Sequence, residues 1–112
     1  IAGYLFAKAH ALVARSLDKD FYDFAYVVIY ANAGGPDELA RKVRASRLGS
    51  LIEETREVWA EVRARFDDVH REAPGQYAHF SRDKVTGSTP EQLRQDAVAG
   101  VQLFVDTLLD KG

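Results

Sequence analysis

The chain has 112 residues, of which 46% are hydrophobic and 29% are charged, and its formal net charge is -2. This length suits one domain, residues 1–112, and the composition is typical of a globular protein. The chain has no cysteine, which excludes disulfides, thiolate nucleophiles and sulfur-ligated zinc, and the slightly acidic charge argues against a protein that coats nucleic acid. No apolar run approaches the ~18 residues of a membrane span and no secretory signal is visible, so we expect a cytoplasmic location. Because the chain opens on Ile1 and lacks methionine, we expect it to be part of a longer protein.

Two apolar helices are predicted at the start of the chain. Residues 2–17 are rich in Ala and Leu, which favour helix, and apolar residues on nearly every side indicate burial. Residues 20–32 follow, with Asp20 as a candidate N-cap. Their Val27-Val28-Ile29 run is compatible with a strand, but the length of the segment and its acidic start favour a helix.

The middle of the chain predicts two more helices. Gly34, Gly35 and Pro36 break the pattern, after which Asp37 is expected to cap a short helix that ends at Gly49. Ser50 and Glu53 fit a reciprocal capping box, and the helix from there to about residue 69 has one apolar face: Leu51, Ile52, Thr55, Val58, Trp59, Val62 and Phe66.

The last third is predicted to contain a long loop and a closing helix. Residues 71–88 show no sustained period and include Pro74, Gly75 and Gly87, which indicates a loop. Thr89 and Gln92 then supply a second capping box around a first-turn Pro90. The closing helix has an apolar stripe: Leu93, Ala97, Val101, Phe104, Val105 and Leu108. The predicted fold class is therefore all-α, a five-helix, bundle-like domain with one long loop.

Four charged residues stand among the apolar residues of the first two helices. Lys8 and Arg15 are seven residues apart and share one face, and Ala11 leaves space between them for an anion such as a phosphate. Asp20 and Asp23 share a face at the start of the next helix, so the four side chains are expected to line one concave corner. A purely architectural alternative stays open, in which Asp20 caps the helix and Arg15 pairs with Asp23.

The order of these residues resembles a motif of a known enzyme family. Lys8-x2-Ala11-x3-Arg15-x3-Lys19-Asp20-x2-Asp23-Phe24 is similar to the K-x2-A-x3-R-x3-[KR]-D-x2-D-L stretch of the AbiEii/AbiGii nucleotidyltransferases, a bacterial toxin and phage-defence family. The resemblance covers residues 1–31, and Phe24 replaces the usual leucine. In that family a polymerase-β-like half, with a Gly-Ser turn followed by an Asp-x-Asp pair that holds magnesium, precedes a helical half. This chain contains no Gly-Ser turn followed by such a pair.

The resemblance implies a function for this helical half. Lys8 and Arg15 would bind the phosphates of a nucleoside triphosphate, and the catalytic assignments Asp20 and Asp23 would orient those cations or complete the pocket. The enzyme would transfer a nucleoside monophosphate to RNA such as tRNA, or to a protein, with Mg²⁺ bound by ligands outside this chain. The 112 residues alone would be inactive, and an antitoxin would be a partner. The competing hypothesis is a non-catalytic helical module that binds a protein.

Other candidate sites are weaker. The basic segment Arg41, Lys42, Arg44 and Arg47 could meet RNA phosphates, but a solvated helix face beside acidic residues is the more ordinary explanation. The rings and cations at Tyr77, His79, Phe80, Arg82 and Lys84 could stack on unpaired bases, although anchoring of a loop by Tyr77 and Phe80 is the more ordinary reason for such rings. His10, His70 and His79 are too scattered in sequence to predict a metal site.

Overall fold

The protein consists of six α-helices and one short 3₁₀ helix, seen in a computed structural model that describes residues 1–15, 17–82, 84 and 87–110. The helices are α1 (Ala2–Arg15), α2 (Asp18–Tyr30), α3 (Pro36–Ala45), α4 (Arg56–Arg65), α5 (Glu72–Ser81) and α6 (Pro90–Leu109), with the 3₁₀ helix η1 at Arg47–Leu51. The described residues contain no strand, which confirms the all-α fold class. None of the described helices combines the length and apolar character needed to cross a membrane.

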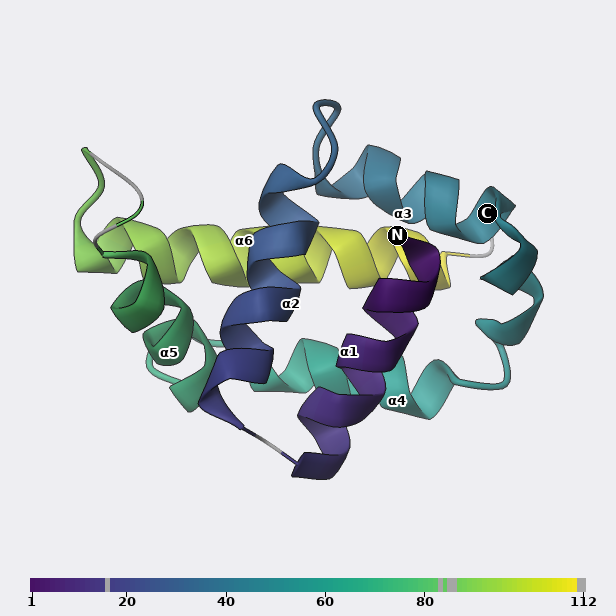
Figure 1. Ribbon diagram of the computed structural model, residues 1–112, viewed down its shortest axis with the longest axis horizontal. Helices are drawn as coiled ribbons and strands as arrows, with labels where there is room; N and C mark the ends of the chain where they lie inside the picture. Colours follow the sequence, from purple (N-terminus) through teal and green to yellow (C-terminus); the bar gives the residue numbers. More distant parts are fainter. Residues whose placement is uncertain (16, 83, 85–86, 111–112) are drawn as a thin grey trace.

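Helix α6 is the longest element, and the others pack around it. Figure 1 shows α6 running along the long dimension of the molecule, with α1 and α2 in front, α3 along one side and α4 along the other. The six residues of the predicted stripe of α6 are all buried. The predicted capping box is also confirmed, since Gln92 N donates to Thr89 Oγ1 at 3.2 Å and Thr89 N donates to Gln92 Oε1 at 2.9 Å.

Aromatic side chains join α1, α2, α4 and α6 at the centre. The ring of Trp59, fully buried on α4, lies 5.3 Å from that of Phe6, 6.2 Å from that of Phe24 and 6.0 Å from that of Phe104, measured between ring centroids. Such rings contribute both large buried area and favourable pair geometry. This contact region holds α1 and α2 side by side, and their relative position determines the candidate site.

Helix α2 approaches α6 closely at Gly100. A methyl group placed on Gly100 would lie 2.9 Å from Cγ1 of Ile29, so a larger residue would push the two helices apart. Gly100 is one of the buried residues of α6, and α2 crosses α6 at this point. Val27, Val28 and Ile29 lie inside α2, as predicted, since the segment is long enough to bury one helical face.

The prediction of one loop over residues 71–88 is wrong, because Glu72–Ser81 forms helix α5. Pro74 is the third residue of α5, where the missing N–H costs nothing because first-turn N–H groups have no intrahelical partner. Tyr77 is fully buried, and its ring lies 5.9 Å from that of Tyr22 on α2. Tertiary packing against α2 and α6 therefore makes a helix of a segment that lacks a clear period.

The predicted helix from Ser50 to about residue 69 is shorter than expected. Ser50 lies in η1, and α4 begins at Arg56. No capping box forms at Ser50, and Thr55 precedes α4 without a capping hydrogen bond from its side chain. The Thr55 hydroxyl instead donates to Leu51 O at 2.8 Å and accepts from Trp59 Nε1 at 3.1 Å, which ties the turn to the aromatic core.

Two helix starts also differ from the predictions. Helix α2 begins at Asp18 after Leu17, so Asp20 lies inside the first turn and is not the N-cap. Helix α3 begins at Pro36 after Gly35, whose φ of 94° suits glycine, so Asp37 is not a cap either. In both cases the helix begins before the aspartate that was predicted to cap it.

Candidate functional site

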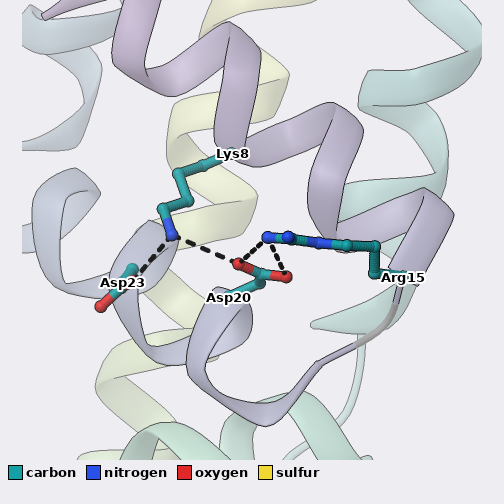
Figure 2. Close-up of polar contacts among 4 residues, drawn as sticks. All are labelled: Lys8, Arg15, Asp20 and Asp23. Carbon is teal, nitrogen blue, oxygen red and sulfur yellow. Dashed lines mark hydrogen bonds and ion pairs between the residues drawn. The ribbon is translucent and has the colours of Figure 1, made fainter.

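The four charged residues predicted from the sequence come together where α1 and α2 meet. We call Lys8, Arg15, Asp20 and Asp23 the ionic cluster. Figure 2 shows the Lys8 ammonium between the two carboxylates, while the Arg15 guanidinium reaches Asp20 from the end of α1. The seven-residue spacing on α1 and the three-residue spacing on α2 each place two side chains on one helical face.

Asp20 is the centre of the ionic cluster. Its carboxylate is 4% exposed and accepts three hydrogen bonds: Oδ1 accepts from Lys8 Nζ at 3.2 Å, and Oδ1 and Oδ2 accept from Arg15 Nη2 at 2.9 and 3.0 Å. A carboxylate this deeply buried requires such partners, because an unpaired charge would be strongly destabilising. Asp20 therefore determines where both cations lie.

Lys8 joins the two carboxylates. Its Nζ also donates to Asp23 Oδ2 at 2.8 Å and lies 5.8 Å from the centroid of the Tyr4 ring. The hydrogen bond with Asp23 is the main cause of a raised Lys8 pKa, so the ammonium is charged at neutral pH. Tyr4 has a raised pKa as well, first because of partial burial and then because of Asp23, which keeps its hydroxyl protonated.

Arg15 is the accessible member of the ionic cluster. Its side chain is 56% exposed, and its hydrogen bonds within the described part of the chain come from Nη2 alone. A guanidinium has five N–H donors, and an ammonium has three, two of which Lys8 uses. Both cations are thus held by carboxylates while retaining donors for another anion.

A shallow groove of about 550 Å³ runs along the outer face of α1 between these cations. Tyr4, Lys8, His10 and Arg15 line it, together with the small side chains Ala7, Ala11 and Ala14. The space expected at Ala11 is therefore present, and Lys8 and Arg15 both reach it. Sequence reasoning missed Tyr4, although its position four residues before Lys8 places it on the same helical face.

The pairing within the ionic cluster differs from the architectural alternative. Arg15 binds Asp20, and Lys8 is the partner of Asp23. Because α2 begins at Asp18, Asp20 lies in the first turn, where it faces the end of α1. Asp20, which was predicted to cap α2, is therefore the buried partner of both Lys8 and Arg15.

The ionic cluster does not provide a magnesium site. Both Asp20 oxygens are occupied by cationic donors, and no group of three or more His, Asp or Glu residues that could hold a metal occurs in the described ranges. Asp18 and Asp20 have the spacing of an Asp-x-Asp pair, but Asp20 is directed into the ionic cluster and Asp18 lines a different pocket. That magnesium is bound by ligands outside this chain stays a prediction from the family resemblance.

The basic segment of α3 is largely engaged by its own surroundings. Arg41 pairs with Asp37 at 3.0 Å, Lys42 pairs with Glu38 at 3.4 Å, and Arg44 donates to main-chain carbonyls at the end of α6. These contacts favour the interpretation of a solvated helix face.

The aromatic residues of α5 anchor it to the rest of the protein. Tyr77 is buried, and the half-buried Phe80 has its ring 5.8 Å from that of Tyr22. Lys84 lies 4.8 Å from the centroid of the same Tyr22 ring. His79 is exposed on α5, and His70, also exposed, borders the same pocket, whereas His10 Nδ1 contacts Phe6 O at 2.8 Å on α1.

Comparison of the chain with protein-family models, curated proteins and solved structures found no match.

Proposed function

We propose that the ionic cluster and the adjoining groove form the triphosphate-binding side of a nucleotidyltransferase of the AbiEii/AbiGii type. The observation that carries the proposal is that Lys8 and Arg15 reach one groove on either side of Ala11, each held by a carboxylate and each with donors to spare. Phosphoryl and nucleotidyl transfer depends mainly on positioning and on charge neutralisation, which two oriented cations supply.

The proposed reaction has defined bonds and roles. An acceptor hydroxyl attacks the α-phosphorus of the triphosphate, the bond to the β-phosphate oxygen breaks, and pyrophosphate leaves while the hydroxyl proton passes to solvent. Lys8 and Arg15 would bind phosphate oxygens, and Asp20 and Asp23 would act by holding these cations in place. Magnesium, bound by the preceding half of the enzyme, would add charge neutralisation. The acceptor would be tRNA or a protein, in the cytoplasm, and an antitoxin would control the activity.

The Asp20 carboxylate would orient both cations before the triphosphate binds. A lysine or arginine on an open surface loses side-chain entropy when it binds a phosphate, whereas Lys8 and Arg15 are already oriented by the hydrogen bonds to Asp20. The two carboxylates also offset the repulsion between the cations before the triphosphate arrives.

The test uses the complete gene product, with each α-³²P-labelled nucleoside triphosphate, magnesium, and tRNA or cell extract as acceptor. Lys8→Ala and Asp23→Ala are expected to abolish label transfer while thermal unfolding changes by only a few degrees. Lys42→Ala is the control, because Lys42 is an exposed lysine of α3 that pairs with Glu38 on its own helix and lies outside both the motif and the groove on α1. Full transfer by both site variants would refute the assignment.

A separate binding test needs only this chain. A nucleotide present at one hundred times its dissociation constant adds about 2.7 kcal/mol to the free energy of unfolding. We expect triphosphate-dependent stabilisation that is lost in Lys8→Ala and retained in Lys42→Ala.

A protein-binding module is the second candidate function, and exposed tyrosines of α2 favour it. Tyr26 and Tyr30 are 42% and 46% exposed, and their ring centroids lie 5.1 Å apart. Exposed aromatic side chains are common where a protein partner binds. In that case Tyr26→Ala would weaken partner binding, and no nucleoside triphosphate would change the thermal stability.

A further inference from the structure

A second pocket, of about 500 Å³, lies where α5 packs beside the first turns of α6 and the start of α2. It shares no lining residue with the groove on α1. Its charged and titratable side chains are Asp18, His70, Arg71, Glu72, His79 and Arg94. These residues come from three separate parts of the chain, so the pocket is a product of the tertiary fold.

Arg94 is the unusual member of this set. The residue is half-buried, and its Nε is buried without a hydrogen-bond partner. Within the described ranges, none of its guanidinium nitrogens makes a hydrogen bond or an ion pair. Its Nη2 lies against the backbone of α5, since a methyl group placed on Gly75 would be 3.8 Å away. A buried donor without an acceptor is costly, and this guanidinium therefore has unused donor capacity that an oxyanion in the pocket could take up.

The neighbouring side chains can add donors to an anion held by Arg94. Arg71 is only loosely paired, with 3.7 Å between its Nε and Asp67 Oδ1. The exposed imidazoles of His70 and His79 make no hydrogen bond within the part of the chain that the structure describes. The second guanidinium and the two imidazoles thus border the same space as Arg94.

Two carboxylates also line this pocket, and their positions matter. Asp18 and Glu72 are exposed, and neither forms an ion pair with Arg94. The unsatisfied guanidinium nitrogen is buried whereas both acids stand at the solvent side. Because Arg94 lines the pocket and is only half-buried, a ligand oxyanion there could still reach the guanidinium. The two acids would weaken its binding by repulsion.

We propose that this pocket binds a phosphate group, with Arg94 as the principal donor and with Arg71 and His79 beside it. Guanidinium groups match the geometry of phosphate oxygens and provide several donors in one plane. The phosphate could belong to a nucleic-acid strand or to free phosphate, and the experiment below separates these sources. This inference stands apart from the nucleotidyltransferase proposal, because it depends on different residues.

The first experiment follows the arginine Nε–Hε signals of this chain by ¹H–¹⁵N NMR during titration with inorganic phosphate. Sodium chloride at equal ionic strength corrects for screening. We expect the Arg94 signal to shift in a saturable way and Arg94→Gln to weaken phosphate binding about tenfold or more. The matched control is Arg47→Gln, which removes the same charge from an exposed arginine far from this pocket. An Arg94 signal that follows chloride alone, or equal binding by the two variants, would overturn the proposal.

Further variants guard against an effect on folding. Arg94→Lys keeps the charge but not the planar group, and we expect intermediate affinity with an unchanged circular dichroism spectrum. Asp18→Asn removes an opposing carboxylate and is expected to strengthen phosphate binding. Weaker binding by Asp18→Asn would contradict the proposed placement of the anion.

The second experiment separates the two sources of phosphate. A fluorescein-labelled ten-nucleotide single-stranded RNA is titrated with the protein, and inorganic phosphate is added as competitor. RNA binding that Arg94→Gln weakens and that phosphate competes away assigns the pocket to a strand, whereas a shift with inorganic phosphate alone assigns it to free phosphate. Failure of both probes to move the Arg94 signal would refute the site.

Discussion

Replacing Asp20 by asparagine tests whether this residue organises the ionic cluster. The substitution keeps the size of the side chain but removes the charge that receives three hydrogen bonds from Lys8 and Arg15. Breaking a buried ion pair costs roughly 3–5 kcal/mol. That cost must be reduced here, because Arg15 is 56% exposed and can return to water while Lys8 keeps Asp23. We therefore expect a loss of about 2–3 kcal/mol in the free energy of unfolding.

Two matched aspartates on the same helix calibrate this effect. Asp23→Asn removes the charge of an 18% exposed carboxylate that accepts one hydrogen bond, from Lys8, and should cost about 1 kcal/mol. Asp18→Asn removes an exposed charge that makes no ion pair within the described residues, so it loses only a helix-dipole interaction of below about 1 kcal/mol.

The assay is urea unfolding at pH 7, followed by circular dichroism and repeated as a thermal scan. At about 4 °C per kcal/mol, Asp20→Asn should lower the melting temperature by roughly 8–12 °C. An Asp20→Asn variant no less stable than Asp18→Asn would show that the buried carboxylate is not held as described, and the orientation of Lys8 and Arg15 would lose its basis.

Three further predictions concern packing, capping and pH. Gly100→Val should destabilise the fold by about 2 kcal/mol, because the valine side chain would collide with Ile29 on α2. Gly3→Ala has open space around it and should stabilise α1 by about 0.5–1 kcal/mol. Equal shifts of the urea midpoint in the two variants would contradict this. Thr89→Ala should cost about 1 kcal/mol by removing the capping box of α6, and Ser50→Ala, which removes no such box, should stay within about 0.5 kcal/mol in the same assay. Burial raises the pKa of the Tyr77 hydroxyl above its ordinary value of 10.0, so the folded state holds this proton more tightly than the unfolded state. The contribution of the protonated Tyr77 hydroxyl to the free energy of unfolding is complete below pH 10 and is lost as the pH rises above it. Tyr77→Phe should therefore lessen the fall in the free energy of unfolding measured from pH 8 to 11.

The proposed binding role would account for a feature of the ionic cluster that a simple structural tie between two helices does not require. A tie between two helices needs one acid and one base, yet here two bases share Asp20 while Lys8 also takes Asp23. Buried charge networks of this kind rarely add much stability compared with apolar packing. Under the proposed function, the network would hold the cations in one orientation, which is what an anion site requires.

The spacing of apolar residues and the capping residues of the sequence were sufficient to predict most of the helices. Residues at helical spacing predicted α1, α2, α3 and α6, and the Thr89 capping box located the start of α6. The same periodicity predicted that Lys8 and Arg15 share a face and that Asp20 and Asp23 share another. These features depend on neighbours within one or two turns, so sequence spacing is sufficient to predict them.

Tertiary structure alone decided the remaining features, because they depend on contacts between distant segments. Helix α5 is stabilised by burying Tyr77 against α2, although its own sequence has no clear period. The pairing of Arg15 with Asp20 followed from where α2 begins and how it packs on α1. The pocket around Arg94 joins residues from three parts of the chain, and no spacing within a single helix can predict which side chains a fold brings together across that distance.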